Sequence, residues 1–466
     1  MILVALAMVA IIAMAALSID VSALYLAREE SQRSADAAAL TAARIISVSG
    51  ITGADPDTSA AEWRKICGGP TSVASLSARA TAQQNGVGGA AATVTVSYST
   101  GTGAGTSTNS DCTVLPDAFA INPVVTVKIS RTGLPTLFSR IWNRSGNSVS
   151  ASATAEAFNP SSSFSGGNGP AGTITPVQPR CVKPLVVPNL DPLHPAGCTN
   201  NCNPFVSATT GQIRNQGISL NGGGANGVIG ETFWLIPDCR LSNPSSCRLR
   251  GAGGQPQANY NTAGFTPAYD LEYIPGQIGT PVSAIPACSQ GDPYEEAIEG
   301  CDAPTNYQCG VSNANLVDLT RNPRNSGATS NGVQCLIHEG SPSTSQPDGQ
   351  DTLNPYAAPS SYPFQILAGT SSPLGAGFAG TPVTGSSSIV SIPIYDNGAG
   401  SNPIASSTTT AVTFVGFLQV FINAVDSSGN VNVTVLNVAG CGNGSNTTAS
   451  PVAGSSPVPV RLITPQ

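Results

Sequence analysis

The chain has 466 residues, which suggests roughly two or three domains rather than one hydrophobic core. Only 10% of the residues are charged, while 50 are Gly and 37 are Pro, a balance typical of a loop-rich β protein outside the cytoplasm. The formal net charge is -7 at pH 7. This charge argues against nucleic acid as a partner, because no basic cluster is present to neutralise phosphates.

The opening stretch, residues 1–47, joins two kinds of helix-forming sequence. Its first nineteen residues contain no charge, Pro or Gly, so they can cross a bilayer as one helix. From Arg28 onward the stretch becomes a polar, Ala-rich helix whose alanines line one face. We predict one long helix that is anchored in lipid at its start and packed against protein at its end. The residues expected to serve the membrane anchor and its assembly contacts are Leu3, Leu6, Ile11, Leu17, Asp20, Tyr25 and Asp36.

Two other interpretations of this stretch are open. A cleaved secretory signal has a basic start, an apolar core of roughly 7–15 residues and a small-residue cleavage site. Residues 13–15 (AMA) fit such a site, but the start is not basic and the apolar core is longer. The stretch also fits a plain membrane anchor. Because the arginines after the apolar run are offset by acidic residues, the positive-inside rule does not orient the helix.

The cysteines orient the chain instead. There are 12 of them, an even number, and none lies in the apolar helix. In an oxidising compartment such a set predicts disulfides that stabilise a domain with a modest core. We therefore expect the chain after about residue 27 to lie outside the cytoplasm. The candidate disulfide residues are Cys67, Cys112, Cys181, Cys198, Cys202, Cys239, Cys247, Cys288, Cys301, Cys309, Cys335 and Cys441.

Residues 48–160 carry the patterns of a small mixed domain. Residues 71–85 begin with a hydroxyl residue, contain good helix formers and are followed by Gly86, which predicts a helix. Alternating apolar and polar residues at 91–99 and 124–131 predict half-buried strands. The other elements expected in this domain are a brief helix at 60–67, an apolar bend or helix at 134–142 and a strand at 148–158.

Residues 161–180 are rich in Pro, Gly and Ser and are predicted to be a linker. Residues 181–466 then combine ten cysteines with short apolar segments that are separated by turn signals. The clearest pattern is a hairpin of 412–425 and 431–438. Its turn is expected at 426–430, further strands at 185–187, 232–236 and 387–394, and one helix at 294–299. The predicted fold class is α+β, with a long amino-terminal membrane helix on a small antiparallel sheet, followed by a disulfide-rich, mostly-β domain.

Patterns that would indicate catalysis are weak. The chain contains two histidines, His194 and His338, and residues 310–314 (GVSNA) fail the Gly-x-Ser-x-Gly nucleophile motif at its last position. Phosphate-binding loops and dinucleotide fingerprints are absent from the sequence. A triad assembled from distant residues is the remaining enzymatic hypothesis. The simpler interpretation is two surface histidines in Pro-rich loops, and we expect no enzyme activity and no cofactor.

One spacing suits a metal site. His194, Cys198 and Cys202 would lie on one face of a helix. The intervening Pro and Gly argue against a helix, and thiols oxidise outside the cytoplasm, so we favour disulfide halves over zinc. Three aspartates in polar turns are candidates for Ca²⁺, although solvated turns are the favoured interpretation: Asp55, Asp57 and Asp426. We therefore expect no metal.

Three short motifs follow one another in the opening stretch: residues 19–22 (IDVS), 24–28 (LYLAR) and 35–43 (ADAAALTAA). In order and spacing they resemble the amino-terminal signature of the TadE/TadG-like family of Flp/Tad pilus assembly. The family's basic, glycine-containing cap before the apolar helix is replaced here by Met1-Ile2-Leu3, so we expect the true start to lie upstream. A strand, an apolar Pro-x-x-Phe segment and a second strand over 124–158 fit the same family.

The resemblance implies a membrane-anchored, non-catalytic component of a bacterial pilus system, active in pilus biogenesis, scaffolding or surface contact. Its implied partners are the inner membrane and other Tad assembly proteins or pilins, with the bulk of the chain periplasmic or extracellular. Cys67 and Cys112 are expected to pair within the pilin-like head. Asp20 would either set the register between neighbouring helices or lie at the headgroup level. The alternative function is a free-standing envelope adhesin or secreted surface protein that shares only the anchor.

Overall fold

The computed structural model resolves the chain into two compact units, and each is discontinuous in sequence. The first comprises Met1–Ile46, Arg64–Ala157 and Val460–Gln466, and the second comprises Ser47–Trp63 and Phe158–Pro459. The residues that the structure describes are 2–49, 52, 64–101, 106–120, 123–134, 146–159, 177–193, 204–214, 227–237, 270–278, 292–300, 307, 315–319, 321, 327–340, 348–355, 364–396, 411–440, 452–454 and 456–463.

This division into compact units follows other lines than the domain boundaries predicted from sequence. Those boundaries treated 1–47, 48–160, 161–180 and 181–466 as successive pieces. In the structure the chain's last strand returns to the first unit, and residues 47–63 belong to the second unit. The physical reason is that strand pairing joins residues that are far apart along the chain, and local composition does not record such pairing.

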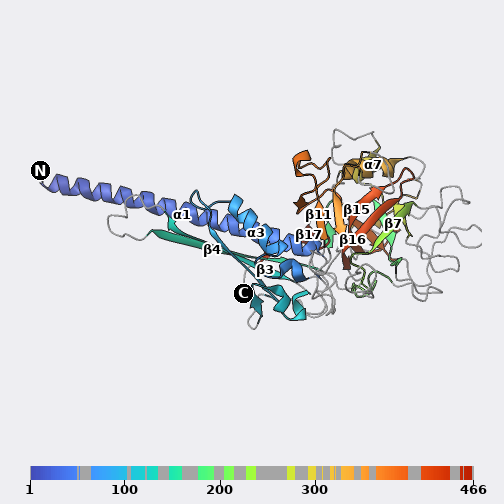
Figure 1. Cartoon of the computed structure of the whole chain (residues 1–466), viewed down its shortest axis with the longest axis horizontal. Coiled ribbons are helices and arrows are strands. Elements are labelled where there is room, and N and C mark those ends of the chain that lie inside the picture. Colours follow the sequence, from blue (N-terminus) through green and yellow to red (C-terminus); the bar gives the residue numbers. More distant parts are fainter. Residues whose placement is uncertain are drawn as a thin grey trace, which may run out of the picture. The chain divides into compact units, whose positions relative to one another are not determined.

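The first helix, α1 (Ile2–Val48), is uninterrupted, as predicted. Its second half contributes a row of alanines to the core, and Ala35, Ala38 and Ala42 are each fully buried. Small side chains at this spacing allow another element to approach the helix closely. Figure 1 shows α1 lying along the sheet of the first unit, with its amino-terminal turns extending beyond that sheet.

The sheet of the first unit has the strand order β18-β4-β3-β1-β2, and all of its neighbouring strands are antiparallel. Alternation along β3 places Val125, Val127 and Ile129 in the core, as the period-two pattern predicted. The paired residues Thr126 and Thr154 are joined by their hydroxyls at 2.9 Å. The elements of this unit after α1 are η1 (Arg64–Cys67), α3 (Val73–Gln84), β1 (Thr93–Ser99), β2 (Thr108–Asn109), η2 (Cys112–Val114), η3 (Asp117–Ala120), β3 (Val124–Leu134), β4 (Asn147–Ala157) and β18 (Val460–Ile463).

The helix predicted at 71–85 and the strands predicted at 91–99, 124–131 and 148–158 are confirmed within a few residues. Of the segment predicted to be a bend or helix, residue 134 ends β3 and the rest lies outside the described residues. The strand β18 was not predicted, because its four residues carry no alternation that separates them from a turn.

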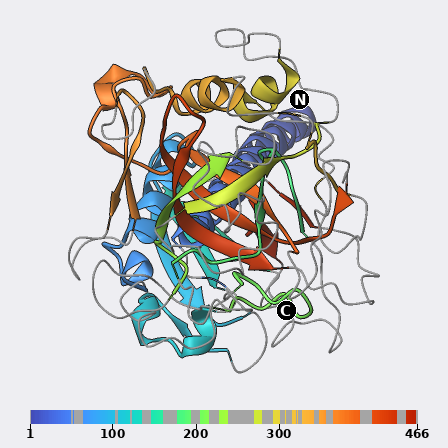
Figure 2. The same ribbon diagram turned by 90° about the vertical axis from the view of Figure 1, so that its right-hand side faces the viewer.

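The second unit contains a closed six-stranded barrel with the strand order β13-β15-β16-β7-β8-β6. Its pairings are mixed, because β7/β8 and β6/β13 are parallel and the others antiparallel. The predicted hairpin is confirmed as β15 and β16. Figure 2 shows the barrel strands crossing one another in the middle of the view, below the yellow and gold helices. The barrel strands are β6 (Leu185–Pro188), β7 (Thr232–Pro237), β8 (Asp270–Pro275), β13 (Ile389–Tyr395), β15 (Phe414–Val425) and β16 (Val431–Gly440).

Strand β15 supplies side chains to two apolar clusters. Phe417 packs with residues such as Val186 and Tyr307, whereas Phe421 packs with Ile366. Two residues four apart in a regular strand would share one face. The register shift between Gln419 and the next residue changes which face the following side chains occupy. One strand therefore joins the two clusters.

Shorter elements complete the second unit. The helix predicted at 294–299 is confirmed, and the linker predicted at 161–180 falls mostly outside the described residues. The three small sheets have the strand orders β10-β11-β12, β14-β9 and β17-β5. These elements are β5 (Val177–Pro179), α5 (Pro293–Glu299), β9 (Asn315–Leu316), α7 (Ala328–Ile337), β10 (Thr352–Pro355), β11 (Phe364–Leu367), η7 (Ala376–Phe378), β12 (Pro382–Val383), β14 (Ala411–Val412) and β17 (Val452–Gly454).

Helix α7 was missed by the sequence analysis. Its sequence, ATSNGVQCLI, is rich in weak helix formers, and Gly332 lies in its middle. Tertiary packing outweighs this low propensity. A Cβ at Gly332 would lie 3.0 Å from the Cβ of Ile298 and 3.1 Å from the carbonyl oxygen of Glu295 on α5. The glycine therefore permits the close approach of the two helices.

We predict that Gly332→Ala destabilises the second unit by about 1–2 kcal/mol, although Ala is the better helix former by about 1 kcal/mol. The reason is that the added methyl group pushes α5 and α7 apart. Urea unfolding of the full chain in detergent would measure the change. The matched control is Gly385→Ala, whose new Cβ meets nothing within 4 Å. Equal stability of the two variants would show that the helix contact is looser than the structure indicates.

Candidate membrane anchor and assembly site

The amino-terminal half of α1 exposes a continuous apolar surface. Among the predicted anchor residues, Leu3, Ile11, Leu17 and Tyr25 are 53% to 81% exposed, and the side chain of Leu6 lies outside the described part. Such a surface is unfavourable in water and favourable in lipid. Of the helices that the structure describes, α1 is the one long and apolar enough to cross a membrane.

Asp20 differs from its exposed neighbours. It is only 5% exposed, it follows the buried Ala16 by one helical turn, and it takes part in an interaction within its own chain. A carboxylate at the headgroup level would instead face outward. Contact between Asp20 and a neighbouring helix remains a prediction. Asp36, the other acidic residue predicted to matter, is partly buried and accepts a hydrogen bond from Gln32 at 2.8 Å.

Beyond Ala27 the helix α1 becomes part of the head. Its Ser34 hydroxyl donates to the carbonyl oxygen of Ala82 on α3 at 3.3 Å. The Glu30 carboxylate accepts from the backbone N–H of Gly88 at 2.7 Å. These contacts lie on the side of α1 that faces α3 and the turn after it. The helix therefore changes its environment along its length, from an exposed apolar segment to a packed segment with small and polar side chains.

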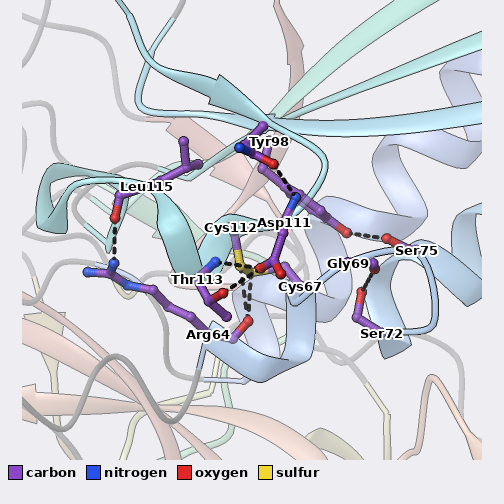
Figure 3. Close-up of a disulfide and its surroundings, with 11 residues drawn as sticks. Arg64, Cys67, Gly69, Ser72, Ser75, Tyr98, Asp111, Cys112, Thr113 and Leu115 are labelled. Atoms are coloured by element: carbon purple, nitrogen blue, oxygen red, sulfur yellow. Dashed lines mark hydrogen bonds between the residues drawn. A yellow bond between two sulfur atoms is a disulfide. The ribbon is translucent and has the colours of Figure 1, made fainter.

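A disulfide between Cys67 and Cys112 fixes the far end of the head, as predicted. Both cysteines are fully buried, and Figure 3 shows the bond between η1 and η2, with Arg64 and Asp111 beside it. The Arg64 guanidinium donates to the carbonyl oxygen of Leu115 at 2.9 Å, and Asp111 caps η2 through the N–H of Thr113. Cys181 and Cys335 in the second unit are also disulfide-bonded, and the other eight candidates lie outside the described residues.

Residues 1–44 match the family model of the putative Flp pilus-assembly TadE/G-like proteins. The amino-terminal segment is TadE/G-like. This finding confirms the resemblance inferred from the motifs. The matched residues comprise the exposed apolar half of α1 and most of its packed half. No curated protein and no solved structure matches the chain.

Outside the TadE/G-like segment, the residues considered for chemistry have structural roles where they are described. His338 ends α7 in a left-handed conformation, with a φ of 61°. Asp426 accepts hydrogen bonds from the backbone N–H groups of Ser428 and Asn430, both at 2.9 Å, as a solvated turn requires. In the described residues no group of three His, Cys, Asp or Glu side chains could hold a metal ion. The remaining candidates lie outside the described residues: His194, Cys198, Cys202, Asp55, Asp57 and residues 310–314.

A buried ionisable pair in the second unit was not predicted from the sequence. Lys183 is 4% exposed and donates from Nζ to the carbonyl oxygen of Gly300, and its burial lowers its pKa to about 7, with Glu299 opposing the shift. Burial likewise raises the pKa of Glu299 to about 7, with Glu295 and Glu296 acting in the same direction and Lys183 opposing them. Neither oxygen of the Glu299 carboxylate has a hydrogen-bond partner in the described structure. Only a solitary lysine beside a Pro-rich strand marked this position in the sequence.

We predict that this pair makes stability depend on pH in two opposite directions. Between about pH 7 and 10 the unfolded chain holds the Lys183 proton more tightly than the folded chain, so stability rises with pH. Between about pH 4.5 and 7 the folded chain holds the Glu299 proton more tightly, so stability falls as pH rises. Lys183→Met should remove the alkaline rise, and Glu299→Gln the acidic fall, in thermal unfolding of the full chain. The exposed Lys128→Met is the control, and curves parallel to wild type in all three variants would contradict the prediction.

Proposed function

We propose that this chain is a non-catalytic, membrane-anchored component of a bacterial Flp/Tad-type pilus system that acts in pilus biogenesis, scaffolding or surface contact. The observation that carries the proposal is the different environment of the two halves of α1. The TadE/G-like residues form one helix whose first half exposes apolar side chains such as Leu3 and Ile11, while its second half is packed into a small α+β head.

The proposed orientation places the head and the second unit on the periplasmic or extracellular side of the inner membrane. The Cys67–Cys112 bond supports this orientation, because disulfides persist in oxidising compartments and are rare in the cytoplasm. The bonded state of Cys181 and Cys335 supports the same side for the second unit. A non-catalytic role is supported by the structural use of His338 and Asp426.

The test is to fractionate the native host and follow membrane retention, protease accessibility and co-recovery with other pilus-assembly proteins. We expect a full-length membrane protein with blocked thiols, an accessible second unit and pilus proteins in the same complex. Leu17→Arg places a charge on the lipid-facing surface and should abolish retention. Val114→Arg changes an apolar residue of the head that is also more than half exposed, and this variant should stay in the membrane.

Two outcomes would overturn the proposal. A shortened, soluble wild-type protein would mean that α1 is a cleaved signal. A membrane-retained protein that is displayed on the surface and recovered without pilus proteins would support the alternative, a free-standing adhesin. That alternative is favoured by one observation, which is that the family match ends at residue 44 and leaves the whole second unit unassigned.

A further inference from the structure

The head of the first unit makes its first contacts with α1 close to the exposed apolar part of that helix. Of the large apolar residues that α1 exposes, the last along the chain is Leu26, which is 60% exposed. One helical turn later, Glu30 accepts a hydrogen bond from the backbone N–H of Gly88 at 2.7 Å. A helix advances by roughly 6 Å over four residues. The head therefore begins within about one turn of the surface that is expected to face lipid.

The hairpin of β3 and β4 ends at this same level. A Cβ at Gly88 would lie 2.6 Å from the Cδ2 atom of Leu134, the last residue of β3. Leu134 pairs with Asn147, the first residue of β4. Figure 1 shows β4 lying along α1 and extending toward its amino-terminal half, and Gln32 Nε2 donates to the carbonyl oxygen of Ser152 at 3.4 Å. Both ends of the connection between β3 and β4 therefore lie beside the start of the apolar part of α1.

The sequence of this connection suits a lipid interface. Residues 135–145 (PTLFSRIWNRS) lie outside the described residues, but the strands on both sides of them are described. The connection contains four large apolar residues, two arginines and no acidic residue: Leu137, Phe138, Ile141, Trp142, Arg140 and Arg144. Tryptophan is enriched where membranes meet water, and arginine is attracted to anionic lipid headgroups. A hairpin connection in water is instead rich in Gly, Asn, Asp and Ser.

The chain also covers one face of the apolar part of α1. Ala16 and Asp20 are 7% and 5% exposed, whereas Ile12 and Leu17 are 62% and 53% exposed. Asp20 takes part in an interaction within its own chain. A helix with no neighbour would leave all four side chains exposed. Another part of the chain therefore reaches the level of Asp20, which lies roughly 15 Å along the helix from Glu30.

We propose that the connection 135–145 is a second membrane contact, which places its apolar side chains in the lipid interface beside α1. Lipid is favoured over a protein partner because the connection leaves the head next to the lipid-facing surface of α1 and continues that surface. The inference rests on the membrane anchoring in the proposed function.

A second contact would fix the orientation of the head. One spanning helix leaves its protein free to tilt and to rotate about the helix axis, and interfacial Trp and Arg side chains restrict both movements. The head would then be held in one orientation against the bilayer.

The experiment measures the depth of Trp142 in the full chain, reconstituted in nanodiscs of phosphatidylethanolamine and phosphatidylglycerol. The chain contains three tryptophans, so Trp63→Phe/Trp234→Phe leaves Trp142 as the one fluorophore. The matched control is Trp63→Phe/Trp142→Phe, which leaves Trp234 on β7 of the second unit. We expect phospholipids brominated near the headgroup end of their acyl chains to quench Trp142 roughly twofold, as for an interfacial tryptophan. The same lipids should leave Trp234 unquenched.

A second measurement avoids the tryptophan substitutions. Photoreactive benzoyl-phenylalanine replaces Phe138 in the native host, and mass spectrometry identifies the molecule that is cross-linked after irradiation. We expect a phospholipid. The control places the same residue at Phe378, which is 53% exposed in the second unit, and should yield no phospholipid.

The outcomes separate this contact from the anchor. Unquenched Trp142 in a chain that stays in the nanodisc, or a cross-link from position 138 to protein alone, would overturn the second contact and leave the anchor standing. Equal quenching of Trp142 and Trp234 would overturn it as well, because the effect would not be specific to the connection. A chain that does not enter the nanodisc would overturn the anchor and, with it, the proposed function.

Discussion

Replacing Cys67 and Cys112 by serine is expected to lower the free energy of unfolding of the head by about 4 kcal/mol. The bond joins cysteines 45 positions apart, and closing a loop of that length in the unfolded chain accounts for a stabilisation of this order. A cost in the folded state adds to this loss of stability. Both cysteine side chains are fully buried, and in the variant two hydroxyl groups would be buried in their place. An effect of this size is a large part of the stability of an ordinary domain.

The local contacts around the bond determine where the loss would be seen. Arg64 is 2% exposed and its guanidinium donates to the Leu115 carbonyl oxygen, so η1 and η2 are joined by a hydrogen bond as well as by the disulfide. Amide hydrogen exchange of the full chain in detergent should therefore speed up over residues 64–120 while the barrel stays protected. Cys335→Ser is the matched control, because it breaks a disulfide of the second unit instead. Unchanged exchange over 64–120 in the double serine variant would show that packing alone holds the head.

Asn437→Asp is expected to destabilise the second unit by about 3 kcal/mol at neutral pH. Asn437 on β16 is fully buried, and its Nδ2 donates to the Ser47 carbonyl oxygen at 2.8 Å and to the Thr52 hydroxyl at 2.7 Å. Aspartate has nearly the same volume but, when ionised, no donor. The substitution therefore leaves buried acceptors facing a carboxylate, which costs more than the loss of a neutral hydrogen bond.

The surrounding hydrogen-bond network makes the stability of the second unit sensitive to a substitution at Asn437. Asn159 donates from Nδ2 to the Val438 carbonyl oxygen at 3.0 Å and also reaches Thr52, so two asparagines share one hydroxyl. Removing both asparagines should cost less than the sum of the two single changes. Urea unfolding of the full chain, followed by tryptophan fluorescence, measures the effect. Asn423→Asp is the control, because Asn423 is itself only partly buried while its Nδ2 also donates to two side chains, those of Asn432 and Thr434. Equal losses at 437 and 423 would contradict the special role of the buried network.

The sequence alone determined the elements whose signals are local. The absence of charge, Pro and Gly in the first nineteen residues, followed by regularly spaced alanines, specified one long helix and the two environments along it. The alternation around the turn at 426–430 specified the β15/β16 hairpin for the same reason, since its strands are neighbours in the chain. The family motifs in residues 19–43 indicated the pilus-assembly likeness that the family model confirms.

Only the tertiary structure decided what depends on distant contacts. The pairing of β18 with β4 returns the end of the chain to the head, and the parallel pair β6/β13 closes the barrel. Neither pairing has a sequence signal, because backbone hydrogen bonds between strands do not depend on side-chain type. Helix α7 formed against its propensity because Gly332 lets it approach α5. The buried roles of Asn437 and Lys183 likewise became visible only when folding placed Ser47 and Glu299 beside them.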